Sequence, residues 1–341
     1  MVVLRQQLPS DDIKPMWPNF KLYTWALWKD LLSIVDQHAL SKFPITQVSD
    51  HSDPLQQIVL VRHLESNYNA YKRDIFSSQL YDAFVNEPDL VKKKPLAIEL
   101  LEDFRKNVWL DYSTNVSPKG HLEWEKLGAN YASLIKQFPD HFPTRIIVSP
   151  YLRTRTTAHY FLKHIEWLDM PVDMLIEPKN VHDMLVGSFK GKDIVLQFSD
   201  DVRERDHGSD IAPSYLRRYM DSLSLFPGFA GLPDEDNDQL YYYTSDGGGE
   251  SQTQVNARGS RHFDSLTSDT QHKQNLVFTH HLFVLWCINT IVKWTYRTFF
   301  NVDHHRRPLN GSMTIFSKID KTHMGQQDKL RVAWYNLILD S

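Results

Sequence analysis

Cysteine is almost missing from this sequence of 341 residues, where Cys287 is the only one. A single cysteine cannot form an intramolecular disulfide, and it cannot build the cysteine clusters of structural zinc sites. A chain without disulfides suits a reducing compartment. We therefore expect a cytoplasmic protein.

Long apolar runs and a large net charge are missing as well. No window approaches the run of about 20 apolar residues that crosses a bilayer. The N-terminal MVVLRQQLPSDDIKP lacks the apolar stretch and small residues of a secretory signal. The formal net charge of -4 argues against broad attraction to nucleic acid. We expect neither a nucleic acid nor a membrane as partner, and the composition leaves the oligomeric state open.

Three short apolar runs are each followed by a polar stretch and then by a helical pattern. They are IVLV at 58–61, RIIV at 145–148 and NLVF at 275–278. Continuous apolar strands that alternate with helices indicate a parallel sheet covered on both faces. Two strand-like runs near the C-terminus, SMTIFSKI and KLRVAWYNLIL, would complete it. The predicted fold class is α/β, a three-layer α/β/α arrangement with a mostly parallel sheet.

Three segments fall outside this pattern. Residues 1–55 contain a helical spacing of apolar residues over 21–43, which predicts an N-terminal helical extension that packs on the main domain or binds a partner. Within the main domain, residues 56–341, we predict a charge-rich helical insertion at 72–115. Residues 180–248 carry scattered aromatics, three prolines, DEDND and GGG. Long irregular excursions in compact domains are usually functional or mobile, so we predict a cap region there.

Four cationic side chains follow the predicted strands: Arg62, His63, Arg153 and His280. Ligands of parallel sheets bind at the carboxyl ends of the strands, so these residues should share one edge. Arginine forks match phosphoryl oxygens, and imidazole is a competent nucleophile toward phosphorus. The leaving oxygen needs a proton, so a carboxylic acid should lie nearby. A histidine after a strand is weak evidence alone; the four together predict phosphoryl chemistry without a metal or cofactor.

Five motifs carry a resemblance to a known family. RHLESNYN (62–69) resembles RHGESxxN, and SPYLRTRTTA (149–158) resembles SPLxRAxQTA. VSPKGHLEWEKLG, GGESQTQVNARG and NLVFTHH resemble the blocks LTxxGxxQAxxLG, GESxxDVxxR and VxxVxHG. In this order they resemble the histidine phosphatase superfamily, in its phosphoglycerate-mutase-like branch, over residues 56–340. Two family glycines are replaced here, by Leu64 and His281.

The resemblance implies a role for each matching residue. His63 would be the phosphoryl acceptor, while Arg62, Arg153 and His280 would contact the phosphoryl oxygens. The substrate-binding residues would be Ser66, Asn69 and His281. Lys72 and Arg73 follow closely and would either add charge there or form a solvated helix face.

The general acid has two candidates. The family branch with an acid directly after the second histidine does not apply, because His281 and Leu282 stand there. The other branch places it after the second arginine, in a pattern like LxERxxG. VRERDHG points to Glu204 and VHDMLVG to Asp183. We favour Glu204, since RERDHG repeats more of the motif, and either residue could be an ordinary surface carboxylate.

The leading hypothesis is a metal-independent phosphohydrolase that acts on a small phosphorylated metabolite, a phosphate ester, through a phosphohistidine at His63. One alternative is a phosphoglycerate-mutase-type transferase, an isomerase with the same first half-reaction. Another is a binding or scaffolding domain, in which Leu64 and His281 crowd the phosphate. Glu250 would orient residues of the edge. The cluster at 303–307 resembles a metal site, but adjacent loop histidines seldom converge on one ion.

Overall fold

The computed structural model describes residues 56–107, 111–177, 184–206, 249–269, 271–292, 299, 308–318 and 330–337. All helices and strands named below belong to one compact unit of the chain, residues 53–293 with 307–341. The predicted N-terminal extension, residues 1–55, lies outside the described residues. Among the described helices, none combines the length and apolar character needed to cross a membrane.

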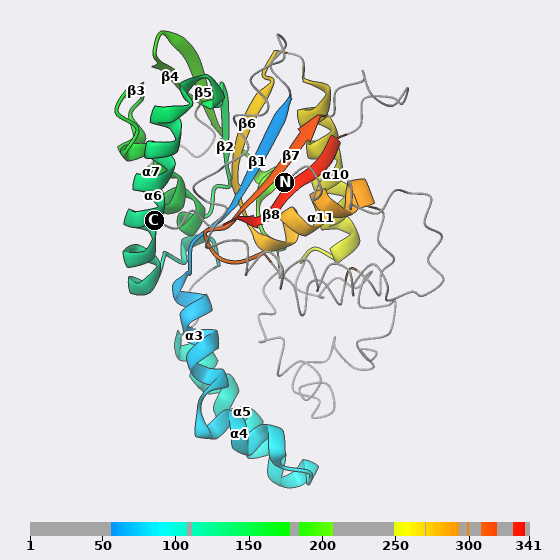
Figure 1. Ribbon diagram of the computed structural model, residues 1–341. Coiled ribbons are helices and arrows are strands. Elements are labelled where there is room, and N and C mark those ends of the chain that lie inside the picture. The colour runs from blue at the N-terminus through cyan, green and yellow to red at the C-terminus, as the bar shows by residue number, and fades with distance from the viewer. Residues whose placement is uncertain are drawn as a thin grey trace, which may run out of the picture. The chain divides into compact units, whose positions relative to one another are not determined.

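One sheet of eight strands organises this unit, in the order β3-β4-β5-β2-β6-β1-β7-β8 (Figure 1). The strands are β1 Gln57–Arg62, β2 Arg145–Val148, β3 Leu168–Asp169, β4 Met184–Phe189, β5 Lys192–Phe198, β6 Gln274–Thr279, β7 Met313–Lys318 and β8 Leu330–Leu337. The three runs predicted as parallel strands, with the two C-terminal runs, are β1, β2, β6, β7 and β8. They are adjacent in the sheet, in the order β2-β6-β1-β7-β8, and β2 also borders β5.

The directions of the strands confirm the predicted fold class. The four central strands β5, β2, β6 and β1 pair in parallel, while β4 and β7 run antiparallel to their neighbours on both sides. Six of the eight strands therefore point the same way. Ile58, Leu60 and Val61 of β1 are buried, as expected of a central strand covered on both faces.

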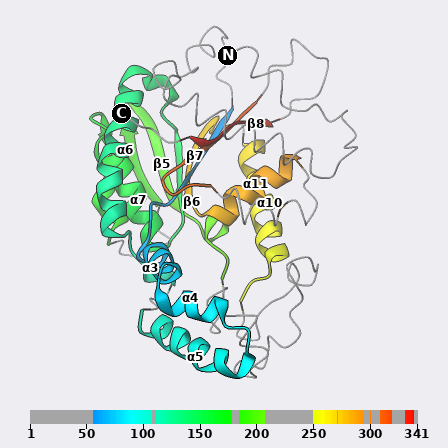
Figure 2. The ribbon, with the colours of Figure 1, turned by 60° about the horizontal axis from the view of Figure 1, so that its bottom comes forward.

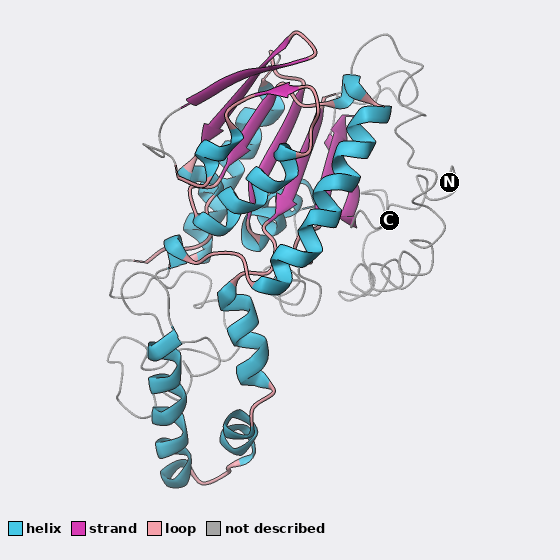
Figure 3. Ribbon diagram, turned by 90° about the vertical axis from the view of Figure 1, so that its left-hand side faces the viewer, coloured by secondary structure: helices cyan, strands magenta, loops and turns pink. Residues whose placement is uncertain are grey.

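Helices cover the two faces in pairs, α6 Pro118–Gln137 with α7 Leu152–Lys163 and α10 Gln252–Ser268 with α11 His281–Val292 (Figure 2). The view in Figure 3 shows helices in front of the strands. The sequence explains α6 directly: the Ser117 hydroxyl accepts the Gly120 N–H at 3.0 Å and caps its first turn. Trp124, Leu127 and Tyr131 repeat at helical spacing on its buried face.

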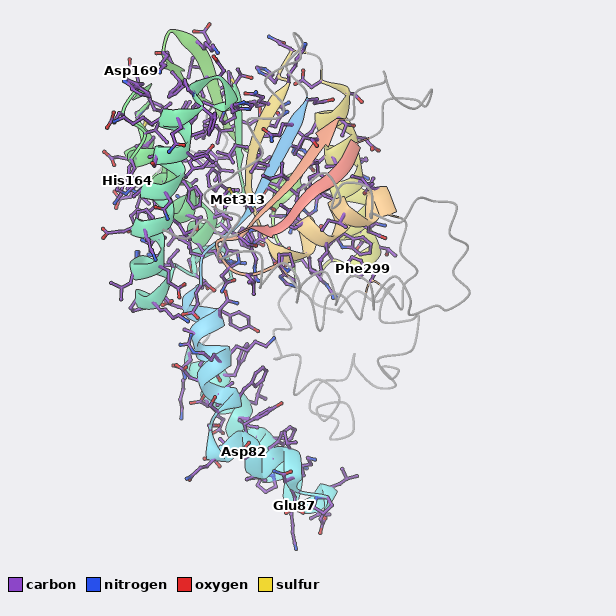
Figure 4. The ribbon with its side chains drawn as sticks, in the orientation of Figure 1. Asp82, Glu87, His164, Asp169, Phe299 and Met313 are labelled. Atoms are coloured by element: carbon purple, nitrogen blue, oxygen red, sulfur yellow. The ribbon has the colours of Figure 1, made fainter. Side chains whose placement is uncertain are left out.

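A helical excursion leaves the end of β1. It consists of α3 Asn67–Phe76, α4 Gln79–Asn86 and α5 Leu90–Asn107, so it occupies most of the segment 72–115. Asp82 and Glu87 mark α4 and its end in Figure 4, and Met313 marks the start of β7 in the sheet. The three helices enclose a small apolar cluster of their own, formed by Ile75, Phe84, Ala97, Leu100 and Leu101.

The structure corrects the predicted boundary of the cap region. Within residues 180–248 we predicted a cap, but β4 and β5 are strands of the sheet, and β5 pairs with the central β2. Lys190 and Gly191 have φ of 50° and 78°, the positive pair that a two-residue hairpin turn requires. The strands escaped prediction because β4 is half exposed, with Met184 and Val186 on the solvent side. Residues 207–248 lie outside the described residues.

Candidate active site

Strand register brings the two histidines together at the carboxyl edge of the sheet. Arg62 lies opposite Thr279 in the parallel pair β1–β6, so His63 and His280 follow at the same level. The His63 N–H donates to the Thr279 carbonyl at 2.9 Å. The two buried imidazole rings are 5.1 Å apart between centroids. Two side chains separated by more than 200 residues therefore face one small volume.

The hydrogen bonds of His63 fix its tautomer. Nδ1 lies 2.6 Å from the Leu64 carbonyl oxygen, which can only accept, so Nδ1 carries the proton. Nε2 accepts a hydrogen bond from Nε of Arg153 at 3.2 Å. Burial holds the pKa of His63 well below its ordinary value, and the charges of Arg153, His280 and Arg62 lower it further. A neutral imidazole thus directs the Nε2 lone pair toward the Arg153 guanidinium.

The two arginines are held by different means. Arg153 lies in the first turn of α7, and its guanidinium carbon is 4.9 Å from the centroid of the Tyr151 ring. The same ring lies 5.0 Å from that of His280, so Tyr151 packs against both groups. Arg62 ends β1 and donates a hydrogen bond to the Pro308 carbonyl. Both arginines are buried, at 6% and 4% exposure for Arg62 and Arg153. Buried guanidinium groups are suited to binding the oxygens of an anionic ligand.

Ser149 also belongs to the site, although no role was predicted for it. It follows β2, whose last residue Val148 lies opposite Phe278 of β6. Its hydroxyl is 2.8 Å from Nε2 of His280. Burial and the Arg153 charge lower the pKa of His280 well below its ordinary value, against the opposing charge of Glu204. The signal for Ser149 was its position directly after a predicted strand.

Glu204 lies beside the histidines, whereas the competing candidate, Asp183, lies outside the described residues. Oε2 of Glu204 is 3.1 Å from Nδ1 of His281 and 4.0 Å from Nδ1 of His280. Its Oε1 accepts the Arg205 N–H at 3.0 Å. Burial raises the pKa of this carboxyl, but the charge and hydrogen bond of His281 outweigh burial, and the pKa falls well below its ordinary value. Glu204 is therefore a buried carboxylate and not a surface one.

A network around Arg258 of α10 holds the segment that carries Glu204. The Arg258 guanidinium donates to both carboxylate oxygens of Glu250, at 3.1 and 3.0 Å. It also donates to four backbone carbonyls, those of Asp200, Asp201, Arg203 and Glu204. Glu250 additionally accepts the Asp206 N–H at 3.1 Å. The predicted orienting role of Glu250 thus has a geometric basis, and Arg258, which ends the GESQTQVNAR block, went unassigned.

Two predicted substrate-binding residues are engaged in a helix cap. Ser66 caps α3, with its hydroxyl accepting the Asn69 N–H, and Asn69 Oδ1 accepts the Ser66 N–H, both at 3.2 Å. Their role toward a substrate stays a prediction. Arg73 pairs with Glu65, whose other oxygen accepts the Ser117 hydroxyl at 2.8 Å. Arg73 therefore links α3 to the start of α6.

Leu64, in the place of a family glycine, packs beside Gly311. It is fully buried, and its side chain packs where a Cβ on Gly311 would come within 3.0 Å of it. Gly311 has φ of 72°, a conformation that suits glycine, and it leaves the space that Leu64 fills.

No group of three or more potential metal-ligating side chains occurs among the described residues. The cluster at 303–307, which resembles a metal site in sequence, lies outside them. The groups that meet at the carboxyl edge include the imidazoles of His63, His280 and His281, two guanidiniums, a hydroxyl and a carboxylate. Such a set can bind a dianion, attack it from Nε2 of His63, and exchange a proton through Glu204.

The comparisons with known proteins found matches among solved structures. No protein-family model and no curated protein matches the sequence. A solved structure of a mycobacterial hydrolase aligns with a TM-score of 0.47 at 14% identity, covering 83% of this chain and 99% of that one. The mycobacterial glucosyl-3-phosphoglycerate phosphatase aligns with a TM-score of 0.46 at 15% identity, over 83% and 99%. A phosphoserine phosphatase mutant from Entamoeba histolytica gives 0.42 at 12%, over 82% and 96%. Identities this low say nothing about the reaction of this chain.

Proposed function

We propose that this chain is a member of the histidine phosphatase superfamily and a phosphohydrolase of small phosphate esters that forms a phosphohistidine at His63. The observation that carries the proposal is the state of His63. A buried, neutral imidazole whose Nδ1–H is bonded to the Leu64 carbonyl keeps its Nε2 lone pair for attack. This lone pair faces the guanidinium of Arg153, the group best suited to hold a phosphoryl oxygen.

The first half-reaction transfers the phosphoryl group to the enzyme. The substrate phosphate docks on Arg62, Arg153 and His280, whose buried positive or polarised N–H groups offset charge on its oxygens. Nε2 of His63 forms a bond to phosphorus as the bond from phosphorus to the ester oxygen breaks. That oxygen takes a proton from the carboxyl group of Glu204, which becomes a carboxylate.

The second half-reaction returns the enzyme to its starting state. The Glu204 carboxylate accepts a proton from water, and the water oxygen attacks phosphorus while the bond to Nε2 breaks. Inorganic phosphate leaves, and Glu204 is again protonated for the next substrate. The low pKa of Glu204 in the free enzyme suits the base of this step, and a bound phosphate dianion beside it favours the protonated form needed for the first.

The test is to trap the intermediate. In the presence of a chelator, the purified chain is mixed with ³²P-labelled phenyl phosphate and quenched within milliseconds in alkali, where phosphohistidine survives. We expect label on a peptide that contains His63, and its loss after acid treatment. Phosphate release without any labelled enzyme would overturn the covalent mechanism, and the absence of both label and release over a panel of phosphorylated metabolites would overturn the function.

The ionisation of His63 gives a prediction on pH. Because burial and the neighbouring positive groups lower its pKa, His63 should stay neutral, with the proton on Nδ1, at pH 6.5, where a free histidine is half charged. Only below its lowered pKa should it charge and lose the ability to attack. ¹⁵N NMR of histidine-labelled protein between pH 4 and 8 measures both the tautomer and the titration. The spectrum of His63→Asn assigns the signal, and titration at or above pH 6.5 would contradict the prediction.

A further inference from the structure

His281 contacts the carboxylate of Glu204. It is the first residue of α11, and its Nδ1 lies 3.1 Å from Oε2 of Glu204. A carboxylate has only acceptor atoms, so a hydrogen bond at this distance requires the proton on Nδ1 of His281.

The surroundings of Glu204 leave His281 as the nearest side-chain donor among the described residues. His280 also comes from the start of α11, but its Nδ1 is 4.0 Å from Oε2. On the Glu204 segment itself, the Arg205 N–H bonds to Oε1 at 3.0 Å. From α10, Arg258 reaches the Glu204 carbonyl at 3.4 Å and not its carboxylate. From α7, Arg153 faces the imidazoles. Orientation of Oε2 therefore depends on His281.

We propose that His281 is a positioning residue that holds Glu204 as a carboxylate and so favours hydrolysis of the phosphoenzyme. This inference rests on the proposed function. In the second half-reaction Glu204 must be ionised and aimed at water, and an Nδ1–H hydrogen bond to Oε2 favours both. His281 itself neither bonds to phosphorus nor exchanges the proton.

The experiment compares His281→Ala with His281→Asn, using rapid quench with labelled phenyl phosphate. Asparagine places its amide N–H close to the position of Nδ1, so it keeps the donor without an imidazole. We expect His281→Ala to slow dephosphorylation on the order of 10- to 100-fold, as loss of a hydrogen bond to a charged group does. The steady-state fraction of phosphoenzyme should rise, the rate of phosphorylation by nitrophenyl phosphate should hold, and His281→Asn should restore most of the turnover.

Several results would overturn the inference. One is wild-type dephosphorylation in His281→Ala, and another is a raised KM with an unchanged dephosphorylation rate, which would assign His281 to substrate binding. The His281 side chain is 21% exposed, so we expect the variants to fold. If His281→Ala does not fold, His281→Gln takes its place, because the longer glutamine side chain moves the N–H donor away from Oε2 of Glu204. If wild-type enzyme forms no phosphoenzyme, the proposed function fails. If it does and the variants match it, only the role of His281 fails.

Discussion

Replacing His63 with alanine should lower kcat/KM for phosphate esters on the order of 10⁴-fold or more, which is the scale of removing the nucleophile of a covalent enzyme. The loss should be equally severe for substrates with good and poor leaving groups, because the attacking atom itself is missing. Rapid quench should find no labelled enzyme. The kinetics are measured on protein shown to be folded by circular dichroism, since the side chain is buried.

Two further variants separate chemistry from packing. His63→Asn keeps a polar side chain next to the Leu64 carbonyl but has no atom that can attack phosphorus, so it should be as inactive as alanine. His141→Ala is the matched control, because His141 precedes β2 at the opposite end of the strand from Ser149. It should retain wild-type activity. Activity above about one tenth of wild type in His63→Asn would show that another group is the nucleophile.

The sequence predicted the part of the site that strands position. Apolar runs of four residues are long enough to be recognised as buried strands, and the residues after parallel strands necessarily meet at one edge. His63 and His280 therefore came together as predicted, by the register of Arg62 with Thr279. The same logic would have found Ser149, which follows β2 and bonds to His280. The prediction of the site was based on charged side chains, and the uncharged hydroxyl of Ser149 was therefore not included.

The features of the site and of the sheet that depend on tertiary contacts could not be predicted from the sequence. Glu204 was predicted from a motif alone, and its hydrogen bond with His281 depends on a tertiary contact between the segment after β5 and the start of α11. Leu64 was interpreted only as a replaced glycine, and its packing against Gly311, far along the chain, could not be predicted from its neighbours in sequence. β4 lacks the continuous apolar run of a central strand, because one of its faces is exposed. For Glu204 and Leu64, the residue that determines the environment lies more than 70 positions away in the sequence. For β4, one face of the strand is exposed to solvent.

The second large effect is expected at Arg258, whose replacement by methionine should both destabilise the fold and reduce turnover. Methionine fills the space of the apolar stem but leaves Glu250 with one fewer cation, and four carbonyls lose a donor. Breaking a buried pair of this kind costs about 3 kcal/mol. Arg203 remains 3.1 Å from Glu250 and limits the loss. Urea denaturation measures the change in the free energy of unfolding.

The catalytic consequence follows from what Arg258 holds. Its guanidinium fixes the carbonyls on either side of Val202 and the carbonyl of Glu204, while Thr279 donates to the Val202 carbonyl at 2.6 Å. Without Arg258, residues 200–204 keep the hydrogen bond from Thr279 to Val202, but the Glu204 backbone is no longer held and its carboxylate loses its fixed orientation. Turnover of alkyl phosphates, whose leaving oxygen needs a proton, should then fall on the order of 100-fold, within the range of general acid catalysis. Nitrophenyl phosphate, with its stable leaving group, should lose far less.

Arg261→Met is the matched control, since Arg261 lies on the same helix and is exposed. It should change neither stability beyond about 0.5 kcal/mol nor the ratio of the two activities. Arg258→Lys refines the test: lysine keeps the charge beside Glu250 but cannot span the carbonyls and the carboxylate at once. If the hydrogen bonds from Arg258 to the four carbonyls and Glu250 orient Glu204, Arg258→Lys should regain more of the free energy of unfolding lost in Arg258→Met than of its lost alkyl phosphate turnover. An equal loss on both substrates in Arg258→Met would mean that the network supports the fold alone, and that Glu204 keeps its direction through His281.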